Sequence, residues 1–407
     1  MLKISPKTAE VLSDAQFRTL VISQALFDLS IFMRGSANSW VIFEITQSQL
    51  WVGLVAGARA IPFLFFALLG GVISDRFGRK NLMVGSLWLF ALTSTVTAIM
   101  IANELLLAWH MIAISLIGAI GGALYGPAFF ALVADIVHSD RLSNANGILS
   151  VAYTTGEMLG PMIVGFIIAV SGADIVFWLI VVGNFFGLVL LIRVQEPRHI
   201  ENLTESSQLS LFAQMGEGLQ YARNTPPLLW LTLLVIAQNL FGSAVFALMP
   251  VYAVDILKIG PTGFGLMGGV LGAGMLIGAI IVSVYGIHHR HAYVMLAMGV
   301  VWDIGMIVFG FSRSIPVSMG SLFCMGLICM PWVTAVLTMF QQASIKKMRG
   351  RVMSLYVIAI NTFPLGWLFG GAVAEWLGNE QALIISAAFG TPVAGLALIF
   401  SKELRRA

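Results

Sequence analysis

Residues 71–80 read Gly71-Val72-Ile73-Ser74-Asp75-Arg76-Phe77-Gly78-Arg79-Lys80. This stretch places one acid, three bases and two glycines directly after a long apolar run, and a second apolar run begins at Leu82. Roughly 20 consecutive apolar residues are long enough to cross a bilayer as a helix. The stretch is therefore expected to be a tight, charged hairpin between two membrane helices.

Composition places the rest of the chain in the same environment. Hydrophobic residues make up 58% of the 407 residues and charged residues only 10%, whereas about a quarter of a soluble domain is charged. The excess of apolar surface requires lipid as its solvent. Apolar windows predict twelve spans near 17–43, 51–74, 82–102, 107–134, 147–170, 173–194, 228–256, 262–285, 292–311, 316–341, 352–377 and 381–401.

The basic residues are distributed unequally between the predicted loops. If both termini lie inside, all but four of the 22 Lys and Arg residues fall on the inner side, the exceptions being Lys258 and Arg313 outside and Arg34 and Arg59 within spans. Positive charge marks the cytoplasmic side of a membrane protein. We expect a multi-pass protein of the cytoplasmic (inner) membrane with both termini cytoplasmic, and no nucleic-acid partner.

One long polar stretch divides the spans into two groups of six. It predicts an N-terminal bundle at 1–194, a cytoplasmic linker at 195–224 and a C-terminal bundle at 225–407. Arg141, Gly156 and Gly160 recur 210 residues later as Arg351, Gly366 and Gly370. Parallel repeats of this kind are typical of one large class of transporters. The predicted fold is an all-α membrane protein, with twelve transmembrane helices in two pseudo-symmetric six-helix bundles.

The loop pattern Gly-x-x-x-Asp-Arg-x-Gly-Arg-Lys resembles the signature loop of the major facilitator superfamily of transporters. The resemblance implies that Asp75 faces the positive end of span eleven and that Arg79 pairs with the acid at the inner end of span four, here Asp135. The alternative is that the loop bases merely set the topology. The implied gating residues are Gly71, Asp75, Arg76, Gly78, Arg79, Lys80, Asp135, Arg349 and Arg351.

Span five carries the sequence Gly156-Glu157-Met-Leu-Gly160-Pro161-Met-Ile-Val-Gly165. The pattern is similar to the antiporter motif of that superfamily, which implies export. Ordinary helix packing is the alternative, because small residues four apart are common where membrane helices meet. The superfamily's arginine in span four is absent from 116–125, which leaves proton coupling open. The predicted packing residues are Gly156, Gly160, Pro161, Gly165, Gly366 and Gly370.

Five charged residues fall in the interior of predicted spans, away from the span ends, where burial is costly and function is the default interpretation. They are Asp28, Arg34, Arg59, Glu157 and Asp303. By residue count the three acids lie near the midplane, which makes them candidates for binding protons or substrate. Arg59 is expected to reach Asp28, and a purely structural ion pair is the alternative for those two.

Further resemblance narrows the family. The segment Met348-Arg349-Gly350-Arg351-Val-Met-Ser354-Leu-Tyr356, the Pro364-Leu-Gly366 that follows, and the opening from Phe17-Arg18 to Glu44 resemble the bacterial exporters of the macrolide efflux and enterobactin exporter type. This resemblance covers almost the whole chain. It implies drug or siderophore-like substrates and a role in multidrug resistance.

The leading hypothesis is a monomeric secondary transporter, not an enzyme, that expels amphipathic small molecules in exchange for protons. An importer of the same fold, a channel and a membrane-integral enzyme are the alternatives. No nucleophile–base pair or metal-ligand spacing points to catalysis, and we expect no cofactor and no metal. The histidines beside Arg290 are interpreted as part of a solvated basic loop.

Overall fold

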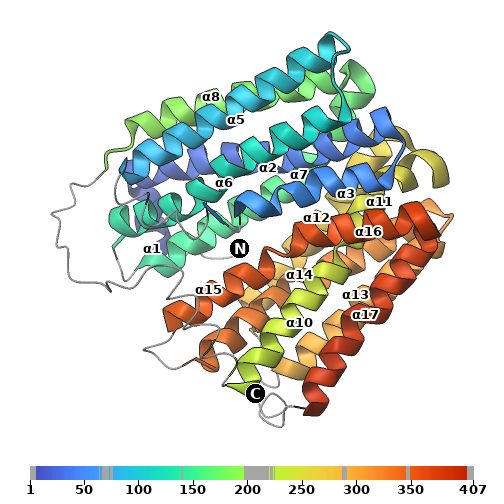
Figure 1. The fold of residues 1–407 in the computed structure, drawn as a ribbon. Coiled ribbons are helices and arrows are strands. Elements are labelled where there is room, and N and C mark those ends of the chain that lie inside the picture. The colour runs from blue at the N-terminus through green and yellow to red at the C-terminus, as the bar shows by residue number, and fades with distance from the viewer. Residues whose placement is uncertain are drawn as a thin grey trace. The chain divides into compact units, whose positions relative to one another are not determined.

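The fold is described from a computed structural model of the chain (Figure 1). The description covers residues 6–63, 65–66, 73, 77–138, 141–196, 220, 223, 225–286, 291–344 and 349–400. Helices account for nearly all of this, and no strand occurs in these ranges. Of the predicted linker 195–224, only residues 195, 196, 220 and 223 belong to the described part.

The described contacts divide the chain into two compact units. The first unit comprises residues 1–38 and 61–207, and the second comprises 39–60 and 208–407. The segment 39–60, which the sequence assigns to the N-terminal bundle, is therefore grouped with the second unit. The predicted domain boundaries stay a prediction.

The first unit is built from long helices that pack side by side. Its elements are α1 (Pro6–Ser13), the first part of α2 (Ala15–Thr46), α5 (Arg79–Ala102), α6 (Ala108–Ile136), α7 (Leu142–Ser171) and α8 (Ala173–Arg193). Helix α5 packs along α8 on one side and α6 on the other (Figure 1). A core that includes Phe17, Leu87, Tyr125 and Phe129 fills the space between the helices.

The second unit contains the end of α2 and the remaining helices. They are α3 (Gln49–Ala58), α10 (Pro226–Gly242), α11 (Ala244–Val251), η2 (Tyr252–Ile256), α12 (Gly260–Tyr285), α13 (His291–Phe311), α14 (Ile315–Gln342), α15 (Arg349–Ile360), α16 (Phe363–Leu377) and α17 (Asn379–Phe400). Helix α14 packs against both α12 and α13, and α3 packs against α16. Its core includes Leu231, Met339 and Phe340.

Nine helices in the described residues are long and apolar enough to cross a membrane. Three predicted spans are not among them: 51–74 and 381–401 include residues outside the described part, and 17–43 lies in α2, which carries Asp28 and Arg34. The all-helical membrane class is thus confirmed, and the count of twelve stays a prediction.

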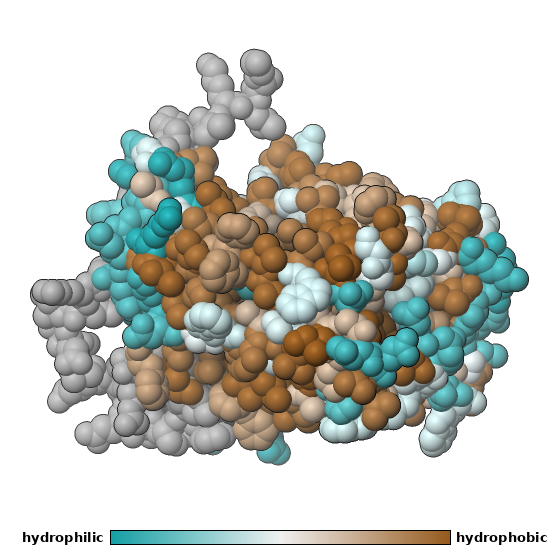
Figure 2. All heavy atoms as spheres, turned by 90° about the horizontal axis from the view of Figure 1, so that it is seen from above, coloured by the Kyte–Doolittle hydropathy of each residue, from teal (hydrophilic) through white to brown (hydrophobic). Residues whose placement is uncertain are grey.

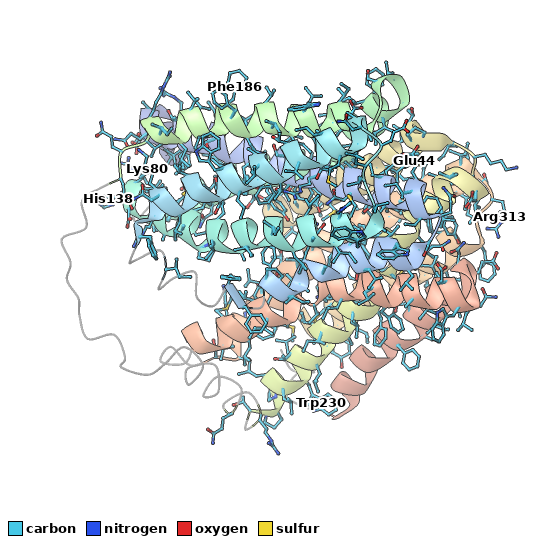
Figure 3. All side chains as sticks on the ribbon, turned by 45° about the horizontal axis from the view of Figure 1, so that its top comes forward. Glu44, Lys80, His138, Phe186, Trp230 and Arg313 are labelled. Atoms are coloured by element: carbon cyan, nitrogen blue, oxygen red, sulfur yellow. The ribbon has the colours of Figure 1, made fainter. Side chains whose placement is uncertain are left out.

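The surface of the helices is suited to lipid. Trp88 on α5 and Phe186 on α8 are each more than half exposed, and Phe186 points away from its helix in Figure 3. On the face shown in Figure 2, hydrophobic residues gather in the middle and hydrophilic residues at both ends. In a protein surrounded by water, large apolar side chains such as these would be expected to be buried. Their exposure therefore indicates a hydrocarbon environment.

Candidate functional site

Part of the charged loop lies outside the described residues. Gly71, Asp75 and Arg76 are outside them, and Arg349 and Arg351 are described only as backbone of α15. Gly78 precedes α5 and has a φ of 82°, a left-handed conformation that glycine adopts without strain. Its identity is therefore required by the turn into α5.

Arg79 ties the start of α5 to the end of α6. Its Nη1 donates to Asp135 Oδ2 in an ion pair and to the carbonyl oxygen of Ala131 at 3.0 Å. Only about 15% of each charged side chain is exposed, so solvent screens the pair less than it would at an open surface. The structure thus brings together the two residues that the resemblance pairs.

Lys80 ties the same end of α5 to α8. Its Nζ donates to the carbonyl oxygens of Ile192 and Val194, both at 2.7 Å. A cation at a helix C-terminus satisfies carbonyls that have no partner within the helix. In return Glu196 Oε1 accepts from the Arg79 backbone N–H at 2.9 Å, which caps the N-terminus of α5. Sequence reasoning missed Glu196, which lies over a hundred residues away in the chain.

Asp28 lies in the core of the first unit and is 4% exposed. Gln24, one helical turn earlier on α2, donates from Nε2 to Asp28 Oδ1 at 2.8 Å. The neighbouring ring of Phe27 packs against Tyr125 of α6 with centroids 4.0 Å apart. The Gln24 Oε1 atom and the Tyr125 hydroxyl are both buried without a hydrogen-bond partner in the described residues. Polar atoms in such surroundings are costly to leave unsatisfied, so the group is a candidate for function.

Glu157 lies on α7 where that helix packs closely on α2. A Cβ on the preceding Gly156 would lie 3.4 Å from the backbone carbon of Asp28, so the two acids stand at the same level of touching helices. The Glu157 Oε2 atom is buried and has no hydrogen-bond partner among the described residues. A carboxyl group in this position is suited to binding and releasing a proton.

Arg34 extends from α2 to both α5 and α6 and is 6% exposed. It donates to Thr93 Oγ1 at 2.9 Å, and its guanidinium lies 5.0 Å from the Phe90 ring centroid. Gly118 leaves room for it, since a Cβ there would lie 2.7 Å from Arg34 Nη2. A basic residue of the first span therefore lies against α6, whose own residues 116–125 include no basic residue.

Asp303 lies on α13 in the second unit and is 5% exposed. Its carboxylate lies over Gly390 of α17, where a Cβ would be 3.2 Å from Oδ1 and 3.5 Å from Gln238 Oε1. Trp302 Nε1 donates to the carbonyl oxygen of Gly242 at 2.9 Å. The acid is thus grouped with polar atoms from α10 and α13.

Arg59 directly follows α3, and its backbone N–H donates to the carbonyl of Ala56. Arg59 belongs to the second unit and Asp28 to the first. The predicted pair between them therefore stays a prediction.

The glycines of span five and span eleven make corresponding contacts. A Cβ on Gly156 would lie 3.2 Å from the backbone nitrogen of Leu29, and one on Gly366 would lie 2.6 Å from the carbonyl oxygen of Asn239. Leu29 and Asn239 are themselves separated by the same 210 residues as the two glycines. The sequence repeat is therefore also a repeat of helix contacts.

The next turn of each helix is packed as closely. A Cβ on Gly160 would lie 3.0 Å from the Met33 backbone nitrogen, and one on Gly370 would lie 2.6 Å from Ala244 Cα. Pro161 lies inside α7, and Gly165 of the same helix is buried. Small residues are needed at these positions because a side chain would meet backbone atoms.

Within the described ranges, no group of three or more His, Cys, Asp or Glu side chains could hold a metal ion. His288 and His289 lie outside those ranges. The candidate site consequently rests on carboxylates, amides and a guanidinium within helices.

Comparison with known proteins places these features in context. A family model described as transmembrane secretion effector matches residues 7–406. The chain is 22% identical to macrolide efflux protein A of Streptococcus pyogenes, over 94% of this chain and 95% of the relative. It is 24% identical to the multidrug efflux pump Tap of Mycolicibacterium fortuitum, over 91% of each chain.

Solved structures with the same fold are also transporters. A D-xylose–proton symporter superposes with a TM-score of 0.75 at 16% identity, covering 97% of this chain and 100% of the other. A bacterial homolog of the human lysosomal transporter Spinster, inward-facing and occupied, gives a TM-score of 0.75 at 13% identity, covering 99% of both chains. At these identities the likeness establishes the fold alone.

Proposed function

The chain belongs to the transmembrane secretion effectors of the major facilitator superfamily, and on that premise we propose that it exports amphipathic small molecules in exchange for protons. It is a multi-pass membrane transporter rather than an enzyme. The observation that carries the export proposal is the match, over more than nine tenths of the chain, to relatives named as efflux proteins. Drugs or siderophore-like compounds are the proposed substrates, the cytoplasmic membrane is the proposed location, and the monomer is the proposed active form.

An importer of the same fold is the second candidate. The fold is shared with a D-xylose–proton symporter, so architecture alone does not fix the direction of transport. The names of the relatives and the antiporter-like glycine pattern of α7, from Gly156 to Gly165, favour export. Alternating access, in which two halves rock about a central site, is the mechanism proposed for either direction.

Two carboxylates are proposed to couple transport to protons. Glu157 is the proposed carrier, because its buried Oε2 has no hydrogen-bond partner in the described residues. Asp28, held by Gln24, is proposed to bind the cationic part of a substrate. Asp303, a buried acid of the second unit, is proposed as a further proton- or substrate-binding residue, and Arg34 and Arg59 are proposed to balance these charges.

Transport across everted membrane vesicles tests the function. With an imposed proton gradient, vesicles from cells that express the protein should take up more macrolide or cationic dye than vesicles without the protein. Without the gradient, this difference should disappear. Gradient-dependent uptake supports antiport export. Uptake in the opposite direction, into right-side-out vesicles only, would establish the importer instead.

Replacing Asp75 with asparagine is expected to slow transport several-fold without loss of membrane insertion. An acid at the positive end of a helix contributes about 0.3–1 kcal/mol, and up to about 2 kcal/mol when partly buried, which is enough to shift a balanced two-state equilibrium. The measurement is initial transport rate per inserted protein, with Asp75→Glu as the control that keeps the charge. Equal rates for the asparagine and glutamate variants would remove Asp75 from the proposed gate.

Cysteine labelling in intact cells is expected to report opposite sides for two pairs of positions. In a background without Cys324 and Cys329, cysteines at Lys258 and Arg313 should react with an impermeant maleimide from outside. Cysteines at Lys80 and Arg290 should react only after permeabilisation, since basic loops remain cytoplasmic. In Figure 3, Lys80 and His138 lie at one end of the first unit, and Glu44 and Arg313 share one end of the second. Labelling of Lys80→Cys in intact cells would refute the proposed topology.

A further inference from the structure

Helix α3 packs closely against α16 along a glycine seam, formed by Gly53 and Gly57 of α3 and Gly371 of α16. A Cβ on Gly53 would lie 2.6 Å from the carbonyl oxygen of Trp367 and 2.8 Å from Leu368 Cα. One turn later, a Cβ on Gly57 would lie 3.0 Å from Leu368 Cβ. Gly371 of α16 is likewise pressed against the backbone of α3 at Gln49. The two helices therefore approach as closely as their backbones permit.

An acid from α16 closes one end of this seam. Ser48 is the N-cap of α3: its Oγ accepts from the Trp51 N–H at 3.4 Å and donates to Glu375 Oε2 at 2.8 Å. The same carboxylate oxygen lies 3.4 Å from the Leu50 backbone nitrogen, which donates to it. The first N–H groups of a helix have no partner within the helix and carry partial positive charge. Glu375 thus supplies a charge-assisted cap to a helix that is distant in the chain.

The contact joins the two halves of the sequence. Helix α3 belongs to the predicted N-terminal bundle and α16 to the C-terminal one, yet segment 39–60 is packed within the second unit. The same segment places Trp40 against Phe264 of α12, with ring centroids 5.5 Å apart. The N-terminus of α3 is at the end of the span predicted to face outward. Rocking of the two predicted bundles in that direction would have to break this contact.

We propose that Glu375 is a gating residue that holds the outer ends of α3 and α16 together. The glycine seam provides the shape of the closed arrangement, and the carboxylate provides a charge-dependent part of its stability. Removing the charge while keeping the shape should therefore favour separation without unfolding either helix. This inference rests on the proposed alternating-access mechanism, since only an outward-open state gives the contact a reason to break.

A buried reporter on α3 tests the proposal without any substrate. Val52 is 1% exposed, so a cysteine there, in a background lacking Cys324 and Cys329, is shielded in this arrangement and should become reachable when the packing of α3 opens. Glu375→Gln is expected to raise the labelling rate by an impermeant maleimide about two- to fivefold, the ratio that a helix-terminus charge supports. Glu375→Lys, which places positive charge at the positive end of α3, should raise it further.

Two further variants separate the cap from general effects of charge. Ser48→Ala should raise labelling in the same direction, and its effect should not add to that of Glu375→Gln, because both remove one contact. Glu44→Gln removes an exposed acid from the neighbouring end of α2 and is expected to leave labelling unchanged. A permeant maleimide applied to the same variants in detergent checks that the cysteine itself reacts normally.

The outcomes distinguish the gate from the transport mechanism. Unchanged labelling in Glu375→Gln and Glu375→Lys overturns the gating role, whatever the protein transports. Increased labelling in both variants, equal to that of Glu44→Gln, also overturns it, because the effect would then be one of net charge. If wild-type labelling does not respond to added macrolide or dye while the variants differ as expected, the gating role of Glu375 stands and the proposal that these compounds are substrates is refuted.

Discussion

Replacing Glu157 with glutamine is expected to abolish export driven by a proton gradient, while leaving substrate binding measurable. Glutamine keeps the size of the side chain but cannot take up or release a proton. The Oε2 atom of Glu157 is buried with no hydrogen-bond partner in the described residues, so replacing that atom breaks no hydrogen bond described there. The measurement is uptake into everted vesicles with an imposed proton gradient, beside equilibrium binding of a labelled substrate.

Two other acids serve as comparisons for this variant. Glu44→Gln removes an exposed carboxylate and should export normally. Asp28→Asn should weaken binding of cationic substrates as well, because Asp28 is proposed to meet the substrate's charge. If Glu157→Gln accumulates substrate against a concentration gradient at the normal rate, Glu157 is structural and the proton follows another route.

Replacing Gly366 with alanine is expected to destabilise the protein by about 1–3 kcal/mol, the usual cost of overpacking a core. A Cβ at this position would lie 2.6 Å from the carbonyl oxygen of Asn239, and backbone atoms cannot move aside as the end of a flexible side chain can. The measurement is the thermal midpoint of the detergent-solubilised protein, followed by size-exclusion chromatography. Transport should fall together with the amount of folded protein.

Gly320 of α14 provides the matched control. A Cβ there meets nothing within 4 Å, so Gly320→Ala should leave the stability unchanged or raise it slightly, as alanine is the better helix former. Equal thermal midpoints for the two variants would show that the seam between α16 and α10 tolerates separation, and would weaken the interpretation of the repeated glycine pairs as tight contacts.

Hydropathy was sufficient to predict most helices because lipid imposes length and composition on a span. The predicted spans 82–102 and 173–194 correspond to α5 (Arg79–Ala102) and α8 (Ala173–Arg193). Interruptions within spans were not predicted. The predicted span 228–256 contains a break at Ser243 and a π-helical turn at Tyr252–Ile256, since an apolar window is insensitive to local changes in backbone hydrogen bonding.

The partner of a charged residue could be predicted only where a known sequence pattern includes both residues. The Arg79–Asp135 pair came from the family resemblance, whereas Glu196 and Glu375 carried no sequence signal, because their contacts depend on how distant helices pack. Gln24 could have been found, since it precedes Asp28 by four residues and such positions are neighbours on a helix. The contacts of Asp303 could not be predicted, because they depend on Gly390 of α17. The sequence does not show which helix packs against that glycine.

The fastening of α5 by Arg79 and Lys80 has a consequence for how the chain is made. Asp135 follows Arg79 by 56 residues, and Ile192 follows Lys80 by 112. While the ribosome is still synthesising α5, neither base has met its partner, and both are available to retain the loop on the cytoplasmic side. Once α6 and α8 have been inserted, the same charges are engaged within the bundle. Because of the order of synthesis, Arg79 and Lys80 act first as a topogenic signal and later as contacts that hold α5 to α6 and α8. An error in loop orientation would therefore arise before these contacts could form and correct it.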